Sequence, residues 1–310
     1  METVRLTKMI HHRWVWLTAV VCSLLVGCSS APTTPPQYQP AESLLTIIAE
    51  FQRYRDADLY RFPYPRDVSG QNVFKATLVR LSNYETLYPR QKYSEIIAYT
   101  RAQAYARLGE YETAGRFCKE AQGFKGELAA RAAEDAAIIE EVRKASVLER
   151  QAENLADFQK LLEDRMARCQ KLVGRYPRQP WQSLAQCEWE QAEVDHAEFI
   201  WANRQVIRDG PKKAFDLMET LRKDHRQSKN FYRHTLRLAN CAYEMATEYA
   251  TLFPPERAGF VWEDFQRWTS SAKSHYLEVG QSFGAQERTE AAAQLAALEA
   301  FERRVRELNQ

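Results

Sequence analysis

One segment of the chain places a glutamate and a histidine three residues apart, at Glu193 and His196. Residues at this spacing share a helix face, and carboxylate-bridged di-metal bundles use such Glu-x-x-His pairs. Those bundles need a second pair, but the residues three before His225, His234 and His275 are Arg, Phe and Ala. The simpler interpretation is an ion pair on a helix surface, so the sequence predicts no metal and no cofactor.

Two cysteines flank a predicted helix joint. Cys169 lies nine residues before Arg178, and Cys187 lies nine residues after it. In an antiparallel hairpin that turns at 177–180, the two thiols would lie at the same height. An oxidising compartment would permit a Cys169–Cys187 disulfide, which would close a loop of about 18 residues and stabilise by about 3 kcal/mol. Two buried thiols are the alternative.

Other chemistry-bearing patterns are missing from the sequence. It contains no Gly-rich phosphate loop, no Gly-x-Ser-x-Gly, no His-Glu-x-x-His and no Cys-x-x-Cys. The two remaining cysteines of the body, Cys118 and Cys241, are expected to be small core residues. The chain is therefore predicted not to be an enzyme.

Prolines divide the body into stretches rich in Ala, Leu, Glu, Gln, Arg and Lys, which are good helix formers. Proline breaks a helix interior, so its positions indicate joints between helices. No stretch alternates apolar and polar residues as a half-buried strand does. The predicted fold is all-α, with helices over about 41–57, 71–87, 92–108, 110–122, 126–148, 151–175, 180–207, 211–224, 229–252, 256–280 and 285–308. The stretch 126–175 fits one long helix or two.

The N-terminus has the pattern of a bacterial lipoprotein leader. A basic segment, 1–13, precedes an apolar segment, 14–26, which is too short for an ordinary membrane span. The segment ends in Leu-Val-Gly27-Cys28, which resembles a lipobox. The resemblance implies cleavage after Gly27, a diacylglyceryl group on the Cys28 thiol and a fatty acyl chain such as palmitate on its amine. Because Ser29 follows where an Asp would imply inner-membrane retention, an outer-membrane anchor facing the periplasm is expected.

The predicted organisation has three parts. Residues 1–27 are the signal peptide, 28–40 a Pro-rich tether, and 41–310 a helical domain with a possible sub-boundary near 150–178. The leader holds three basic residues and one acidic, so the remainder has 40 of each and no net charge. Nucleic-acid binding, which needs a concentrated basic excess, is therefore not expected.

A four-residue phrase recurs at three predicted helix ends. It begins with Tyr88-Pro89, then Tyr176-Pro177, then Phe253-Pro254. An aromatic side chain can close the apolar contact between helices while the proline forces the turn. This recurrence indicates repeated structural units.

The clearest unit lies between the first two phrases and resembles the tetratricopeptide repeat, a helix–turn–helix module of about 34 residues. Small residues at Ala102, Ala114 and Ala121 would let two helices approach closely, Gly109 suits the turn, and Tyr111 would pack into the gap. A looser copy runs from Ala202 to Leu221. A non-repeating helical bundle is the alternative.

Together with the lipobox, this unit resembles the tetratricopeptide lipoproteins of the outer membrane, among them the helical lipoprotein of the barrel-assembly machinery. The long segment 126–175 and a diverged C-terminal half depart from that plan. The resemblance implies an α-solenoid that presents a surface to another envelope protein or peptide.

The expected function is therefore a lipid-anchored binding scaffold, with its oligomeric state left open. One alternative is a helical hydrolase of cell-wall polymer, which would need a carboxyl with a raised pKa in a cleft. Another is carbohydrate capture on aromatic platforms. Aromatic residues crowd three regions of the chain; most are expected in the core, and any exposed on a concave face would be partner anchors.

Overall fold

The computed structural model describes residues 39–56, 72–177 and 181–310. The predicted signal peptide, Gly27, Cys28 and nearly all of the tether lie outside the described residues. The chain divides into two compact units, residues 1–46 and 47–310. Of the first unit only the opening turns of one helix are described, so the account below concerns the second.

The described part is all-α, as predicted, and contains eleven helices. They are α2 (Gln39–Asp56), α3 (Val73–Leu87), α4 (Ser94–Arg107), α5 (Tyr111–Gly123), α6 (Ala129–Ser146), α7 (Leu155–Arg175), α8 (Trp181–Ala202), α9 (Gly210–Asp224), α10 (Phe231–Leu252), α11 (Trp262–Gly280) and α12 (Arg288–Leu308). The largest differences from prediction are the start of α11, six residues later than expected, and the end of α8, five residues earlier. None of the described helices has the length and hydropathy of a membrane span.

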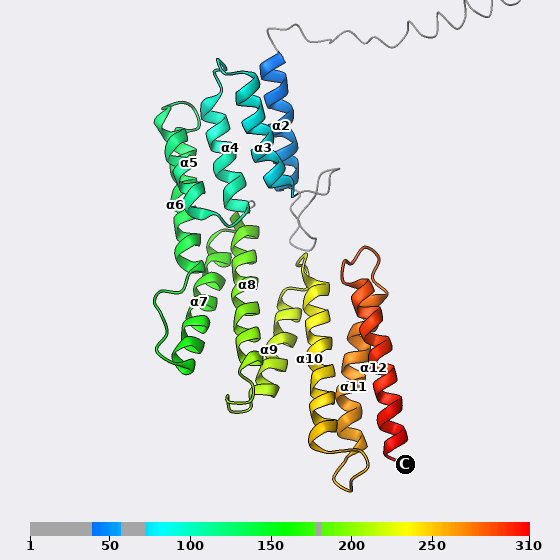
Figure 1. The fold of residues 1–310 in the computed structure, drawn as a ribbon. Helices are drawn as coiled ribbons and strands as arrows, with labels where there is room; N and C mark the ends of the chain where they lie inside the picture. The colour runs from blue at the N-terminus through cyan, green and yellow to red at the C-terminus, as the bar shows by residue number, and fades with distance from the viewer. Residues whose placement is uncertain (1–38, 57–71, 178–180) are drawn as a thin grey trace, which may run out of the picture. The chain divides into compact units, whose positions relative to one another are not determined.

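From α3 to α12, each helix packs against the next one in the chain, which makes a helical hairpin array (Figure 1). Most of its contacts are therefore local in sequence. The largest apolar cluster joins α4, α5, α6, α7 and α8, and a second joins α10, α11 and α12. Each hairpin buries its apolar stripe against a sequence neighbour, as stacked helical units do.

The recurring aromatic–proline phrase ends three helices in the same way. Tyr88, Tyr176 and Phe253 are the C-cap residues of α3, α7 and α10, with φ/ψ of −126/65, −114/73 and −120/86. The N–H of each cap donates to the carbonyl four residues earlier. The following proline disfavours helical backbone at the cap residue, which explains why the helix stops there. The phrase is a shared helix terminator.

The stretch 126–175 forms two helices. α6 ends at Ser146, and α7 begins after the N-cap Asn154, whose side chain accepts a 3.0 Å hydrogen bond from the N–H of Asp157. An Asn side chain at this position satisfies a backbone donor that the helix itself leaves open. Arg150 also pairs with the Asp157 carboxylate and closes the connection.

The unit that resembles a tetratricopeptide repeat is the α4–α5 hairpin. Ala102, Ala114 and Ala121 have no exposed surface, so the two helices lie close together. Gly109 forms the turn with φ 78°, a conformation that costs residues with a Cβ atom more than glycine. The ring of Tyr111 is buried in the same cluster.

A buried carboxylate links three helices of the array. Asp135, in α6, accepts hydrogen bonds from Tyr99 Oη in α4 at 2.6 Å and from Trp181 Nε1 in α8 at 3.2 Å. Arg107 Nη1 in α4 donates to Ser183 Oγ in α8 at 2.8 Å. A buried acceptor with several donors favours one arrangement of the helices that carry them. These contacts place the first turns of α8 beside the α4–α5 hairpin.

Candidate binding cavity

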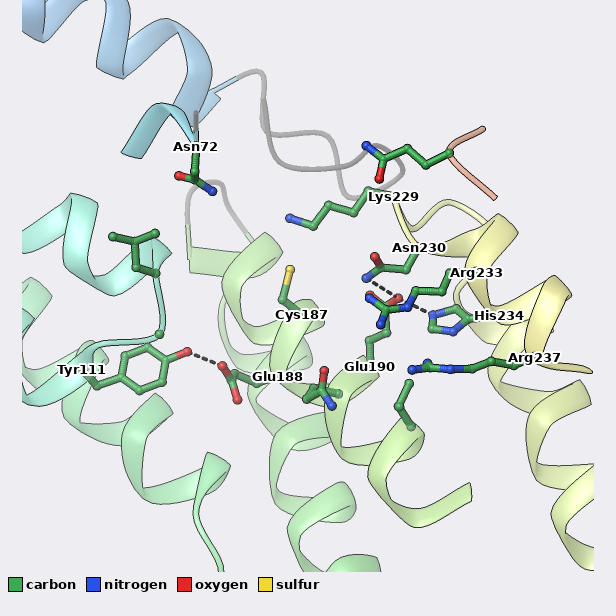
Figure 2. A pocket seen from close by; sticks show the side chains of 15 residues that line it. Asn72, Tyr111, Cys187, Glu188, Glu190, Lys229, Asn230, Arg233, His234 and Arg237 are labelled. Atoms are coloured by element: carbon green, nitrogen blue, oxygen red, sulfur yellow. Dashed lines mark hydrogen bonds and ion pairs between the residues drawn. The ribbon is translucent and has the colours of Figure 1, made fainter. Parts of the chain in front are cut away.

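A cavity of about 740 Å³ lies among the α4–α5 turn, α8 and the start of α10 (Figure 2). α8 contributes residues on one side, including Glu188, Glu190 and Gln191, and α10 contributes Arg233 and Arg237 on the other. This volume falls within the range of ordinary ligand sites. Because the cavity is formed by helices from separate hairpins, it depends on how the hairpins pack.

The wall of the cavity is organised around Glu190, whose side chain is 3% exposed. One of its carboxylate oxygens accepts hydrogen bonds from Ser228 Oγ at 2.6 Å, Asn230 Nδ2 at 3.1 Å and His234 Nε2. Burial opposes ionisation of Glu190, but the contacts with His234 and Ser228 outweigh it and hold the pKa below its ordinary value. A buried carboxylate in α8 thus fixes the turn that leads into α10.

His234 is the strongest partner of that carboxylate. Burial lowers the pKa of His234, whereas the hydrogen bond to Glu190 opposes the shift. The pKa values of Glu190 and His234 are both lowered. A neutral His234 imidazole that donates its Nε2–H to an ionised Glu190 carboxylate is consistent with both shifts. Beside it, His225 is fully buried and contacts the Glu193 carboxylate at 2.7 Å. Two Glu–His pairs therefore connect α8 to the start of α10 and to the turn before it.

Glu188 faces the opposite side of the cavity. Tyr111 donates a hydrogen bond to its carboxylate across the space between the α4–α5 hairpin and α8 (Figure 2). Burial raises the pKa of Glu188, and the Tyr111 hydrogen bond opposes that shift. Glu188 is therefore a carboxyl with a raised pKa in a cavity, the feature that the hydrolase alternative requires.

Cationic side chains line the α10 side of the cavity. Lys229, Arg233 and Arg237 follow one another at intervals of four residues, and Figure 2 shows all three extending toward α8. Arg233 and Arg237 lie in α10, where a spacing of four places them on one face, and Lys229 lies in the turn before the helix. Arg237 also pairs with Glu198 at 2.8 Å. Arg233 is exposed and makes no hydrogen bond or ion pair with any residue in the described ranges.

The sulfurs of Cys169 and Cys187 are not joined in the structure, and the disulfide between them stays a prediction. Cys169 is buried and its Sγ lies 3.4 Å from the carbonyl oxygen of Ala145 in α6. Cys187 lines the cavity, where Figure 2 shows its sulfur. Equal distance from the turn gives two residues the same position along the hairpin axis. It does not determine on which face of its helix each residue lies. Cys118 and Cys241 are both buried, as expected.

The expected surface ion pair between Glu193 and His196 is also absent. Glu193 pairs with His225 on another segment, and His196 is buried with its Nε2 3.6 Å from the Glu163 carboxylate. α8 is enclosed by neighbours on several sides, so this face is not a surface. Within the described ranges, no cluster of three or more His, Cys, Asp or Glu side chains is placed to hold a metal.

Aromatic residues contribute little to the cavity. Tyr111 and His234 are the aromatic rings among the described lining residues. The large aromatics are mostly buried, such as Phe51, Phe74 and Phe265. The more exposed ones, including Phe283 at 94%, lie away from the cavity lining. The described residues that line the cavity are mostly polar or charged.

Two residues that line this cavity were singled out from the sequence for other reasons. Tyr111 was expected to pack between two helices, and Cys187 was expected to form a disulfide. It missed Glu188, Glu190 and the cationic side chains. The four-residue spacing of Arg233 and Arg237 was a readable signal, since both lie on α10. Glu190 and His234 are 44 residues apart, and no local pattern joins them.

Comparison with known proteins identifies no relative: no family model, no curated protein and no solved structure matches the chain. The class of protein is therefore defined by the architecture of the described residues alone. It is an all-α helical hairpin array with a polar cavity between its hairpins.

Proposed function

We propose that the protein is a membrane-anchored periplasmic scaffold that binds a segment of another envelope protein or a peptide in the cavity between α8 and α10. The observation that carries the proposal is the cavity itself, which has room for several side chains and is lined by hydrogen-bonding groups. Helical hairpin arrays commonly present such surfaces to extended chains. The partner's backbone amides would find donors and acceptors in Gln191 and Asn230.

The anchor is proposed from the sequence. A basic, then apolar leader ends at Gly27-Cys28, as in bacterial lipoproteins. Lipid on Cys28 would hold the protein on the periplasmic face of the outer membrane, because two or more acyl chains bind a bilayer firmly. Replacing Cys28 by Ser should move the protein from the membrane fraction to the soluble fraction. An unchanged distribution would remove the anchor from the proposal.

Partner binding can be tested in living cells by placing a photo-crosslinking amino acid at Gln191, which lines the cavity and is exposed. Irradiation should give a discrete adduct with one envelope protein or peptide. The matched control carries the same group at Arg303, an exposed residue of α12 outside the cavity lining. No adduct at Gln191, or the same adduct from both positions, would contradict the proposal.

Glu188 supports a second candidate, a hydrolase of cell-wall polymer. Its raised pKa would suit a general acid. A hydrolase of this kind also needs a base or nucleophile, and the neighbouring carboxylate of Glu190 is engaged with Ser228, Asn230 and His234. Release of labelled fragments from purified cell wall, abolished by Glu188→Gln, would establish the enzyme in place of the scaffold.

A further inference from the structure

We infer that the cavity wall formed by the turn 225–230 and the first turn of α10 is an acid-sensitive switch, closed on α8 at neutral pH and open in mild acid. The inference rests on the proposed function for its consequence, which is release of the bound partner segment. It starts from a buried cluster of histidine and glutamate side chains that joins the turn to α8.

Two histidine–glutamate pairs attach this wall to α8. His225, the C-cap residue of α9, contacts the Glu193 carboxylate at 2.7 Å, and His234 of α10 contacts Glu190. Both imidazole rings are buried, and their centroids lie 6.5 Å apart. Because each pair contains a titratable imidazole, the attachment of the wall depends on pH.

A second proton on His234 would lack an acceptor in the closed wall. Nε2 of His234 faces the Glu190 carboxylate, so the added proton would bind Nδ1. Nδ1 is buried and has no hydrogen-bond partner among the residues that the structure describes. A charged N–H group that is buried without an acceptor is unfavourable, so the closed wall favours the neutral imidazole.

Charged and titratable groups surround His234. They are Glu190 of α8, His225 at the end of α9 and Arg237 of α10, and the cavity lining adds Lys229 and Arg233. On the α11 side, Glu278 is held in an ion pair with α9. Burial is the largest influence and lowers the pKa of His234; the hydrogen bond to Glu190 opposes this shift, and Arg237 and His225 add to it.

The direction of the pH effect follows from this lowered pKa. Opening exposes His234 to water, where its pKa returns to the ordinary value of 6.5. The open form therefore takes up a proton before the closed form, so the closed form loses stability as pH falls below about 6.5. The pKa of Glu190 is also lowered, so its carboxylate stays ionised at about pH 5.5, where the switch is tested.

Contacts that do not titrate hold the rest of α10. Leu236, Ala239 and Ala242 pack in an apolar cluster with α11 and α12. Acid therefore releases the turn 225–230 and the first turn of α10, and leaves the α10–α11 hairpin in place. Asn230 and His234 line the cavity, so their movement removes one of its walls and the partner segment dissociates.

Hydrogen exchange of the full-length protein in detergent, at about pH 7.5 and about pH 5.5, tests the opening after correction for intrinsic exchange rates. Protection of residues 225–234 should fall by about fivefold or more in acid, since each pH unit below an ordinary histidine pKa shifts the equilibrium by up to about tenfold. Protection of α4, which contains no histidine, should change by less than about twofold. This comparison separates local opening from global unfolding.

His234→Gln keeps an amide donor for Glu190 but cannot titrate, so protection of residues 225–234 should then differ by less than about twofold between the two pH values. The matched control His275→Gln removes a half-buried histidine of α11 outside the cavity lining and should retain the full acid effect. Circular dichroism checks that both variants fold. An NMR titration of His234 in the unaltered protein gives a readout that needs no variant, and an ordinary or raised pKa there would overturn the switch.

Release of the partner is measured with the photo-crosslinking group at Gln191 in isolated envelopes. The adduct should fall by about fivefold or more at about pH 5.5, and His234→Gln should retain it. Unchanged protection in acid, or an equal loss of protection in His234→Gln, would overturn the switch. An adduct that persists while the wall opens would overturn the release. The absence of an adduct at both pH values would refute the proposed function, while hydrogen exchange would still decide the switch by itself.

Discussion

The carboxylate of Glu190 in α8 accepts a hydrogen bond from Nε2 of His234 in α10, and the two side chains are 3% and 2% exposed. The same oxygen accepts hydrogen bonds from Ser228 and Asn230 in the turn before α10. One buried acceptor thus fixes the end of a turn and the start of a helix. The cavity wall between α8 and α10 depends on this contact.

Glu190→Ala should lower the free energy of unfolding by about 3 kcal/mol or more, because it leaves buried donors without their acceptor. Urea denaturation followed by circular dichroism measures this change. The matched control is Glu134→Ala, which removes an exposed carboxylate from α6 and should change stability by less than about 0.5 kcal/mol. Equal effects of the two substitutions would show that the Glu190 network does not hold the array together.

Two glycines should respond to alanine in opposite directions. A Cβ atom at Gly210 would lie 2.3 Å from the carbonyl oxygen of Arg204, so Gly210→Ala should cost about 1–3 kcal/mol. At Gly115, inside α5, a Cβ atom meets nothing within 4 Å, so Gly115→Ala should stabilise by about 0.5–1 kcal/mol. Thermal unfolding of both variants tests the close approach of the α8–α9 connection to α9. A stable Gly210→Ala protein would mean that this approach is looser.

Protonation of His196 should destabilise the protein in mild acid. Burial lowers the pKa of His196 below its ordinary value of 6.5, although the charges of Glu163 and Glu193 oppose the shift. The unfolded chain then takes up a proton before the folded one, so stability is lost as pH falls below about 6.5. The loss is at most about 1.4 kcal/mol per pH unit for this group.

The comparison for this prediction is His196→Leu, which cannot titrate and has a similar volume. Urea denaturation at about pH 7.5 and about pH 5.5 should show a smaller loss of stability in the leucine variant than in the unaltered protein. His234 and His275 also have lowered pKa values, and burial is the largest cause for both, so part of the acid sensitivity should remain. Identical pH dependence of the two proteins would rule out the assigned role of His196.

The cysteines should differ in reactivity. Burial raises the pKa of Cys118 to about 12, of Cys169 to about 11 and of Cys241 to about 12. Cys187 is less buried and lies at the cavity. A maleimide should therefore label Cys187 first in the native protein, and the other three only after unfolding. Labelling of Cys187 that requires prior reduction would instead support the disulfide with Cys169.

The helices could be predicted from the sequence because their determinants are local. Prolines at the joints, helix-forming residues between them and the aromatic–proline terminators need no knowledge of distant contacts. The break within 126–175 was left open because it contains no proline. Its signal was Asn154, an N-cap residue three positions before Asp157, which also explains why α7 starts there.

The cavity was harder to predict because its parts come from separate hairpins. Glu188 and Tyr111 are 77 residues apart, and helical periodicity does not show which faces of two distant hairpins meet. The same limit applies to the predicted pairing of Cys169 with Cys187, because equal distance from a turn does not give the face on which each residue lies. Only the spacing of Arg233 and Arg237 was readable in advance, since both lie on α10.

The proposal that the cavity binds a partner is tested most directly by filling the cavity. Gln191→Trp places a large ring at its edge, at an exposed position where folding should be unaffected. The account predicts that this variant, with the crosslinking group at Gln286, another exposed residue of the lining, loses the partner adduct by at least about tenfold, whereas Arg303→Trp retains it. An undiminished adduct from the Gln191→Trp protein would contradict the account, because the partner would then bind elsewhere on the array.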